Sequence, residues 1–131
     1  MTVHKSRFLW SLVVASSTVL AVLGALPSQA LAQPAAAAAQ IERGGKVYRN
    51  WCAECHNERG FVTFTFQQRY QGAIPAVLDQ RRDLTREVVG YFVRNGVSYM
   101  PFFRKTEITD AQLDDLSAYL TSDPEQRKKA K

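Results

Sequence analysis

"NWCAECHNERG" (residues 50–60) contains both cysteines of the chain and one of its two histidines. Cys52 and Cys55 are three positions apart, and His56 follows directly. Three kinds of site use closely spaced thiols of this type: a zinc site, a disulfide, and a covalently attached haem. The rest of the chain decides among them.

Zinc and disulfide chemistry fit this pattern poorly. A structural zinc site needs four cysteine or histidine ligands in a tetrahedron, whereas this stretch has three, and His56 directly follows Cys55. A thioredoxin-like redox pair belongs in a βαβ pattern, but the residues before Cys52 have a helical pattern. A structural disulfide across a two-residue gap closes a very small loop and stabilises little.

The order Cys-x-x-Cys-His is the attachment signature of c-type haem. The two thiols add to the two vinyl groups on one edge of the porphyrin, and the adjacent histidine reaches the iron from one side. We therefore predict one haem c per chain, attached through Cys52 and Cys55, with His56 as the proximal axial ligand.

The N-terminus has the features of a secretory signal. Lys5 and Arg7 precede an uncharged apolar stretch, and Ala30-Leu31-Ala32 has the pattern of a cleavage site. We predict a cleaved signal peptide over residues 1–32, a periplasmic location and no stable membrane insertion after cleavage. An uncleaved membrane anchor is the alternative, because the apolar stretch is nearly long enough to span a bilayer.

Cleavage would leave one small domain, which buries too little surface to be comfortably stable without reinforcement. We predict an alanine-rich linker (33–40), a haem domain (41–123) and a basic, solvated tail (124–131). Loss of the two basic residues in the signal lowers the formal net charge from +5 to +3. This excess is too small and too dispersed to indicate a nucleic-acid partner.

The second axial ligand follows from the short inventory of possible donors. With His4 in the signal, no second histidine remains, and Met100 is the one methionine outside the signal. Pro101 cannot continue a helix and favours an extended course before it, which suits a side chain presented across the ring from His56. We predict Met100 as the distal axial ligand; the alternative is that it fills a gap in the core. Histidine–methionine ligation raises the reduction potential.

Helical patterns account for most of the remaining chain. Residues 41–56 have one small or apolar face. A second helix is expected after a cap at Asp83 or Thr85, ending at Asn95-Gly96, with its inward side chains being Val88, Val89, Phe92 and Val93. A shorter helix is expected from Pro75 to Arg82. The alternating segment 61–66 has no partner strand, and we expect an extended loop there.

The clearest helix start is near the C-terminal end. Thr109 and Gln112 form a capping-box pattern, and Ile108 with Leu113 forms a hydrophobic staple. The buried stripe is predicted to contain Leu113, Leu116 and Leu120, with Tyr119 at its edge. Residues 121–124 end this helix.

These features together resemble class I, single-haem cytochrome c over residues 41–121. In that family a glycine eight residues before the first cysteine, and an aromatic residue four before it, contact the C-terminal helix. Gly44 and Tyr48 occupy these positions, with Leu116 and Tyr119 as counterparts. The resemblance implies an all-α fold, a small cytochrome c fold of three to five helices wrapped around one covalently attached haem.

The chain departs from the family after the histidine. The family usually has a Gly-Pro shortly after the histidine whose proline carbonyl accepts the imidazole N–H, whereas this chain has no proline between His56 and Pro75. Such an acceptor tunes the ligand. We expect a backbone carbonyl between Gly60 and Phe66 to take this role.

A narrower resemblance involves "YFVRNGVSYMPFF" and "ITDAQLDDLSAYL" (residues 91–103 and 108–120). These segments are similar to the cytochrome subunit of p-cresol methylhydroxylase and related phenol-oxidising flavocytochromes. The resemblance implies an electron-transfer protein, not itself an enzyme. It would accept single electrons from a dehydrogenase, a flavoprotein that oxidises a 4-alkylphenol, and pass them to a downstream acceptor.

Three alternatives remain open at this point: a freely diffusing cytochrome c that feeds a terminal oxidase or reductase, a haem sensor or peroxidase-like enzyme with an open sixth site, and an exported binding module without a cofactor. The candidate haem pocket is apolar and contains Trp51, Phe61, Phe64, Phe66, Tyr70, Ile74, Phe92, Val97, Tyr99, Phe102 and Phe103. Cations that could steer an acidic partner, or simply form a solvated face, are Arg69, Arg81, Arg82, Arg104 and Lys105.

Overall fold

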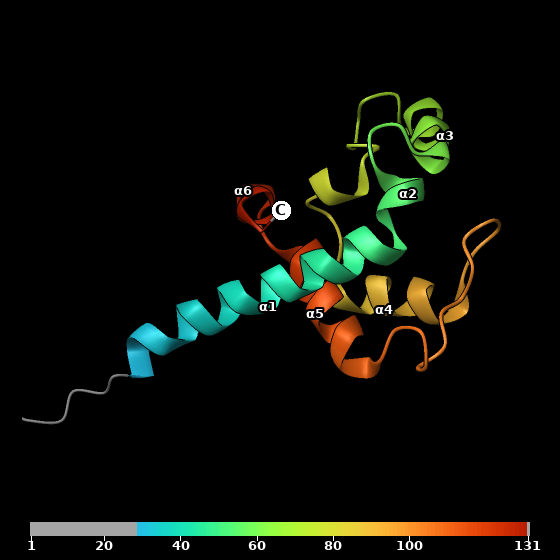
Figure 1. Cartoon of the computed structure of the whole chain (residues 1–131). Helices are drawn as coiled ribbons and strands as arrows, with labels where there is room; N and C mark the ends of the chain where they lie inside the picture. Colours follow the sequence, from blue (N-terminus) through green and yellow to red (C-terminus); the bar gives the residue numbers. More distant parts are fainter. Residues whose placement is uncertain (1–28, 131) are drawn as a thin grey trace, which may run out of the picture.

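The computed structural model describes residues 29–130, and within that range the regular elements are all helices (Figure 1). They are α1 (Gln29–Trp51), α2 (Ala53–His56), α3 (Phe61–Tyr70), the 3-10 helix η1 (Leu78–Gln80), α4 (Arg86–Asn95), α5 (Asp110–Thr121) and α6 (Pro124–Lys129). All but the last four residues of the predicted signal peptide lie outside the described residues. The predicted all-α class is confirmed, with α2 as a single turn that continues α1.

The crossing of α1 and α5 forms the centre of the fold (Figure 1). Gly44 is required there, because a Cβ at this position would overlap the Asp115 carbonyl oxygen and lie 2.7 Å from the Tyr119 Cβ. The rings of Tyr48 and Tyr119 are in contact, with centroids 5.5 Å apart. The predicted crossing is therefore confirmed. The buried apolar core around it is Val47, Tyr48, Cys52, Val89, Val93, Ile108, Leu116, Tyr119 and Leu120.

Helix α4 packs on α5 and begins at the predicted cap. The Thr85 side chain accepts a hydrogen bond from the Val88 N–H. The helix ends at Gly96, whose φ of 67° lies in the region that favours glycine. Val89 and Val93 are buried as expected.

Two side chains of α4 that we expected to face inward are exposed. They are Val88 (41% exposed) and Phe92 (37% exposed). The buried stripe of α4 is therefore narrower than the sequence pattern predicted, because Val89 and Val93 alone face the α5 side.

Helix α5 has the predicted boundaries and caps. The Thr109 hydroxyl accepts from the Gln112 N–H and the Gln112 side chain accepts from the Thr109 N–H, so both halves of the capping box are present. Ile108 is fully buried and Leu113 packs on the same core. Asp123 then caps α6, with Pro124 in its first turn.

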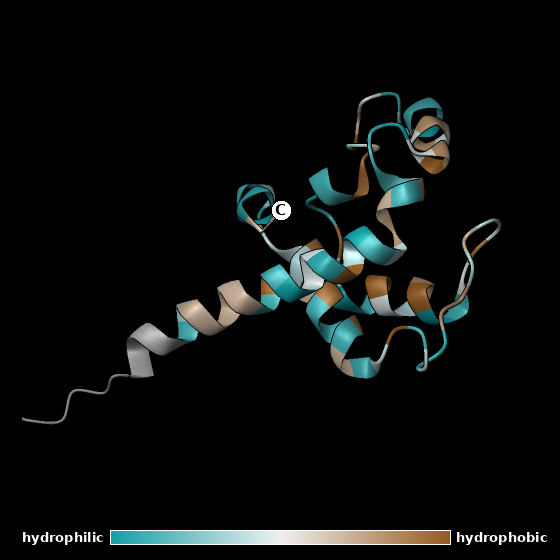
Figure 2. Cartoon of the chain, in the orientation of Figure 1, coloured by the Kyte–Doolittle hydropathy of each residue, from teal (hydrophilic) through white to brown (hydrophobic). Residues whose placement is uncertain are grey.

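The tail after residue 123 is largely exposed, as expected, but it is helical and one of its side chains is buried. Figure 2 shows α6 as hydrophilic, yet it is folded onto the body of the protein. Arg127 is only 1% exposed, and its guanidinium donates to the carbonyl oxygens of Leu120 (3.1 Å) and Arg81 (2.6 Å). Arginine can bury its apolar stem and still satisfy its charge with carbonyl oxygens, which composition alone does not show.

The segment 33–40, predicted as an alanine-rich linker, is helical and continuous with the rest of α1. Most of its side chains are exposed. Alanine has the highest intrinsic helix propensity, so a helix can extend through such a segment without packing partners. The division into linker and domain stays a prediction. No helix in the part of the chain described here is long and apolar enough to cross a membrane.

Two local predictions between α2 and α4 are wrong. Residues 61–66, expected as an extended loop, form the first part of α3, because a helix satisfies its backbone groups internally where a lone strand cannot. The helix expected from Pro75 to Arg82 is reduced to the three residues of η1.

Candidate haem site

The Cys-x-x-Cys-His segment lies at the junction of α1 and α2. Cys52 is the N-cap of α2; its N–H donates to the Tyr48 carbonyl (2.8 Å) and its own carbonyl accepts from the His56 N–H (3.0 Å). Cys52 and His56 are buried, whereas Cys55 is exposed. The two cysteines are not joined in a disulfide. One helical turn therefore holds the two thiols and the imidazole in a fixed relation.

The chain after His56 is held by contacts that the sequence did not reveal. A Cβ at Gly60 would overlap the Cys55 carbonyl oxygen, so glycine is required at this close approach. The Asn57 carbonyl accepts from the Gly60 N–H (3.1 Å) and from the buried Thr63 hydroxyl (2.7 Å). The first turn of α3 thus anchors the loop that follows His56.

Burial determines the protonation of the site. It raises the pKa of the Cys52 thiol to about 12. Burial also lowers the pKa of His56, which favours the neutral imidazole that a metal ion requires. In the described part of the chain, no group of three or more His, Cys, Asp and Glu side chains is placed to hold a metal ion.

The buried Nδ1 atom of His56 has no hydrogen-bond partner within residues 29–130. The expected acceptor, a backbone carbonyl between Gly60 and Phe66, does not bind it. The ring of Phe66 lies beside the imidazole instead, with centroids 6.3 Å apart. A buried, unsatisfied imidazole N–H in a native fold indicates an acceptor, such as a water, that the chain alone does not provide.

Met100 closes a tight turn rather than lying in a long extended segment. Val97 and Met100 exchange two backbone hydrogen bonds (3.0 and 2.9 Å), and Ser98 has a positive φ of 52°. The next residues are tied to α4 by a hydrogen bond from the Phe103 N–H to the Val93 carbonyl (2.8 Å). Met100 is partly buried and packs against the core cluster that contains Cys52.

Two aromatic pairs join the Met100 segment to the cysteine–histidine segment. Trp51, directly before Cys52, contacts Phe103 edge to face at 5.7 Å. Phe61 contacts Tyr99, directly before Met100, at 6.0 Å. Residues on both sides of the motif therefore meet residues on both sides of Met100. The structure brings the four predicted site residues to one region of the fold.

The predicted apolar pocket residues fall into two groups. Phe66, Tyr70, Ile74 and Phe103 are partly buried. The exposed group is Trp51, Phe61, Phe64, Phe92, Val97, Tyr99 and Phe102. Two thiols, a neutral imidazole with an uncommitted nitrogen, a thioether and many aromatic rings together fit a covalently held haem.

Four of the five cations proposed to steer a partner are engaged in ion pairs. Arg81 pairs with Asp83 and its guanidinium lies over the Tyr70 ring at 5.5 Å. The other three pairs are Arg82–Asp123, Arg104–Glu107 and Lys105–Asp110, at 2.7–2.9 Å. Their charges are largely neutralised locally, so they offer little field for docking.

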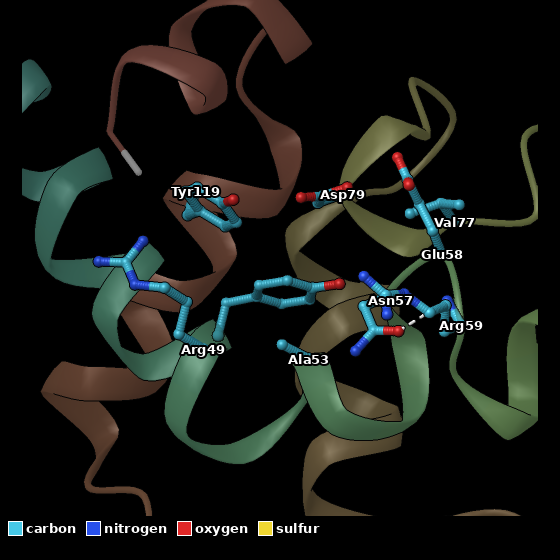
Figure 3. Close-up of a pocket in the computed structure, with 9 residues that line it drawn as sticks. Arg49, Ala53, Asn57, Glu58, Arg59, Val77, Asp79 and Tyr119 are labelled. Carbon is cyan, nitrogen blue, oxygen red and sulfur yellow. Dashed lines mark hydrogen bonds between the residues drawn. The ribbon is translucent and has the colours of Figure 1, made fainter.

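A pocket of about 620 Å³ lies next to the motif, and sequence patterns gave no signal for it. Its lining comes from α1, α2, the loop after His56, η1 and α5, and includes Tyr48, Arg49, Ala53, Asn57, Glu58, Arg59, Val77, Asp79 and Tyr119. Figure 3 shows the Tyr119 hydroxyl and the Asp79 carboxylate facing one another across it.

Comparison with known proteins identifies the family. The family model described as "Cytochrome C oxidase, cbb3-type, subunit III" matches residues 39–120. Cytochrome c6 of Thermosynechococcus vestitus (strain NIES-2133 / IAM M-273 / BP-1) and cytochrome c6 of Thermostichus vulcanus are each 33% identical over 87 residues. These matches cover 66% of this chain and 73% of each relative. No solved structure matches significantly. The chain therefore belongs to the class I cytochrome c family, the electron carriers that hold haem c covalently.

Proposed function

We propose that this protein is a freely diffusing periplasmic carrier, which takes single electrons from a donor dehydrogenase and delivers them to a terminal oxidase or reductase. Both matched relatives carry the name cytochrome c6, and the matched 87 residues are 73% of each, so they are small proteins like this chain. The proposal rests on one observation: two aromatic pairs, Trp51–Phe103 and Phe61–Tyr99, place the Met100 turn beside the Cys-x-x-Cys-His turn. When bound there, haem c takes up and releases one electron at its iron.

Each predicted site residue has a role in this proposal. The Cys52 and Cys55 thiols form the two covalent links, for which the single turn of α2 sets the spacing. The neutral His56 imidazole is the proximal axial ligand. The Met100 sulfur is the distal ligand, presented by a turn that two backbone hydrogen bonds close. With both axial positions filled, no substrate binds the iron, which disfavours a sensor or a peroxidase-like enzyme.

The identity of the electron donor stays a prediction. The resemblance to phenol-oxidising flavocytochromes has no counterpart in the matched family or relatives, whose names include no flavoprotein. The paired state of Arg82, Arg104 and Lys105 also gives no concentrated charge for a permanent acidic partner. A mobile carrier with several transient partners fits these observations better than a subunit of one enzyme.

Replacement of the distal ligand tests the axial assignment. Met100→Ala should keep the covalent haem, because the thiols and His56 are unchanged. It should lower the reduction potential and make the reduced protein bind carbon monoxide rapidly, because a thioether raises the potential and fills the sixth site. Optical spectra, redox titration and carbon monoxide binding measure these changes.

Tyr99→Phe is the matched control for this experiment. Tyr99 is the adjacent residue, 85% exposed, and phenylalanine retains the ring that contacts Phe61. This variant should behave as the wild-type protein. If Met100→Ala has the wild-type potential and refuses carbon monoxide, Met100 is not the ligand. If the wild-type protein itself binds carbon monoxide rapidly, the proposal of a closed electron carrier is wrong.

A further inference from the structure

Tyr48 makes a contact that its place in the helix crossing does not require. Its ring packs against Tyr119 between α1 and α5, a role that phenylalanine could also fill. Its hydroxyl, however, donates a buried hydrogen bond to the His56 carbonyl oxygen at 3.2 Å. This contact joins the crossing of α1 and α5 directly to the backbone of the proposed proximal ligand.

The bond is made to a helix end. His56 is the last residue of α2, and the carbonyls in the last turn of a helix have no partner within that helix. The next carbonyl, that of Asn57, is held by the Thr63 hydroxyl of α3. Two successive carbonyls are thus held by side chains of different helices: that of His56 by Tyr48 of α1, and that of Asn57 by Thr63 of α3.

The donor is itself rigid. Tyr48 is 3% exposed, and its ring is confined by the close approach that Gly44 permits. The position of its hydroxyl therefore follows the geometry of the α1–α5 crossing. A displacement of that crossing would be transmitted to the His56 peptide, and so to the orientation of the imidazole.

We propose that Tyr48 is a positioning residue for His56, whose hydroxyl fixes the proximal histidine and thereby sets the reduction potential. The inference rests on the proposed role of His56 as an axial ligand. The O–H dipole presents its positive end to His56, which favours the reduced state. The hydroxyl therefore raises the potential, and its loss should lower it.

Tyr48→Phe tests this role, because it removes the hydroxyl and keeps the ring that packs on Tyr119. Haem attachment should stay at the wild-type level. The equilibrium constant for reduction should fall about threefold to tenfold, about 30–60 mV for a one-electron couple. The electron paramagnetic resonance spectrum of the oxidised protein should also change, because it depends on the orientation of the axial imidazole.

Tyr119→Phe is the control. It also removes a buried hydroxyl from the lining of the same pocket, but the Tyr119 hydroxyl has no hydrogen-bond partner in the described chain. The reduction potential and electron paramagnetic resonance spectrum of Tyr119→Phe should match those of the wild-type protein. An equal shift in both variants would mean that pocket polarity, not the bond to His56, sets the potential, and would overturn the proposal.

The bond is also measurable directly. His56 and His4 are the two histidines of the chain, and His4 lies in the predicted signal, so histidine labelled with 13C at its carbonyl marks His56 in the mature protein. In the reduced, diamagnetic protein, this resonance should move in Tyr48→Phe and stay fixed in Tyr119→Phe. Should Tyr48→Phe not accumulate, the reduced Tyr119→Phe protein in H₂O should still show a slowly exchanging hydroxyl proton, because the buried Tyr48 hydroxyl is hydrogen-bonded to His56.

The outcomes separate the two proposals. A wild-type protein with both axial ligands, together with an unchanged potential, resonance spectrum and 13C resonance in Tyr48→Phe, overturns the role of Tyr48 alone. Absence of a slowly exchanging hydroxyl proton in the reduced Tyr119→Phe protein does the same. A wild-type spectrum without histidine ligation overturns the proposed site itself.

Discussion

Tyr119 is a buried phenol whose hydroxyl has no hydrogen-bond partner among residues 29–130. Burial is the main cause that raises its pKa to about 12, and the nearby Asp79 carboxylate adds to it. The same two causes raise the pKa of Tyr48. Both side chains are therefore more strongly held in the neutral form in the folded protein than in the unfolded chain.

This shift predicts alkaline instability. Because the pKa of Tyr119 is higher in the folded than in the unfolded protein, its contribution to the free energy of unfolding is fully present below the unfolded pKa near 10. This contribution is lost as the pH rises towards the folded pKa of about 12. Tyr119→Phe should lose less stability than the wild-type protein over that window, since one of the two groups no longer ionises. Urea unfolding of the haem protein at several pH values between about 8 and 12 measures the difference.

Tyr91→Phe is the control, because Tyr91 is an exposed tyrosine of α4. Its stability should follow that of the wild-type protein at every pH. If Tyr119→Phe also follows the wild-type curve up to about pH 12, burial does not restrain the ionisation of Tyr119, and this explanation is wrong.

Single residues with special chemistry were predictable, whereas their supporting contacts were not. The Cys-x-x-Cys-His pattern and Met100 stand out because few other donors exist in the chain. Three of these contacts depend on atoms that only the folded chain brings together. They are the close approach at Gly60, the hydrogen bond from the Thr63 hydroxyl to the Asn57 carbonyl, and the hydrogen bond from the Tyr48 hydroxyl to the His56 carbonyl. The expected backbone acceptor for the His56 imidazole was wrong, because no group in the described chain accepts from its Nδ1 atom.

The α1–α5 crossing is the element contact on which the rest depends. Gly44→Ala would place a Cβ on the Asp115 carbonyl oxygen, and a backbone atom cannot move aside without separating the helices. Overpacking of this kind costs about 1–3 kcal/mol, and we expect the upper part of that range. Chemical denaturation of the haem protein measures the loss.

Gly90→Ala is the matched control, because it makes the same glycine-to-alanine change inside another helix. Gly90 lies inside α4, and a Cβ there meets no atom within 4 Å. Since glycine in a helix interior is less favourable than alanine, this variant should be about 0.5–1 kcal/mol more stable. Equal, small effects of the two substitutions would show that the close crossing is absent in solution.

Elements with a local signal were predicted well, and those that depend on distant partners were not. The capping box of α5 and the Thr85 cap of α4 are encoded within four residues. The first part of α3 alternates like a strand, and only the absence of a partner strand makes it a helix. Helix α6 packs on the rest of the protein through one buried arginine, Arg127. The basic composition of this segment gives no sign that one of its cations is buried.

At the scale of the whole molecule, one helical body presents the cysteine–histidine turn and the methionine turn to a shared apolar region. The core of the described chain is small, with nine residues in its buried apolar cluster. A large apolar cofactor attached to both sides would supply much additional buried surface, which a domain of this size needs. The fold class and the family followed from the motif, whereas the pocket beside it did not.

The central claim is that Cys52 and Cys55 hold one haem covalently. Intact mass measurement of the exported, denatured wild-type protein tests it most directly, with the double variant Cys52→Ala, Cys55→Ala as the comparison. The wild-type chain should carry the mass increment of one haem, and the double variant should carry none. A wild-type chain without that increment, or a double variant that retains it, would show that these cysteines do not hold a haem.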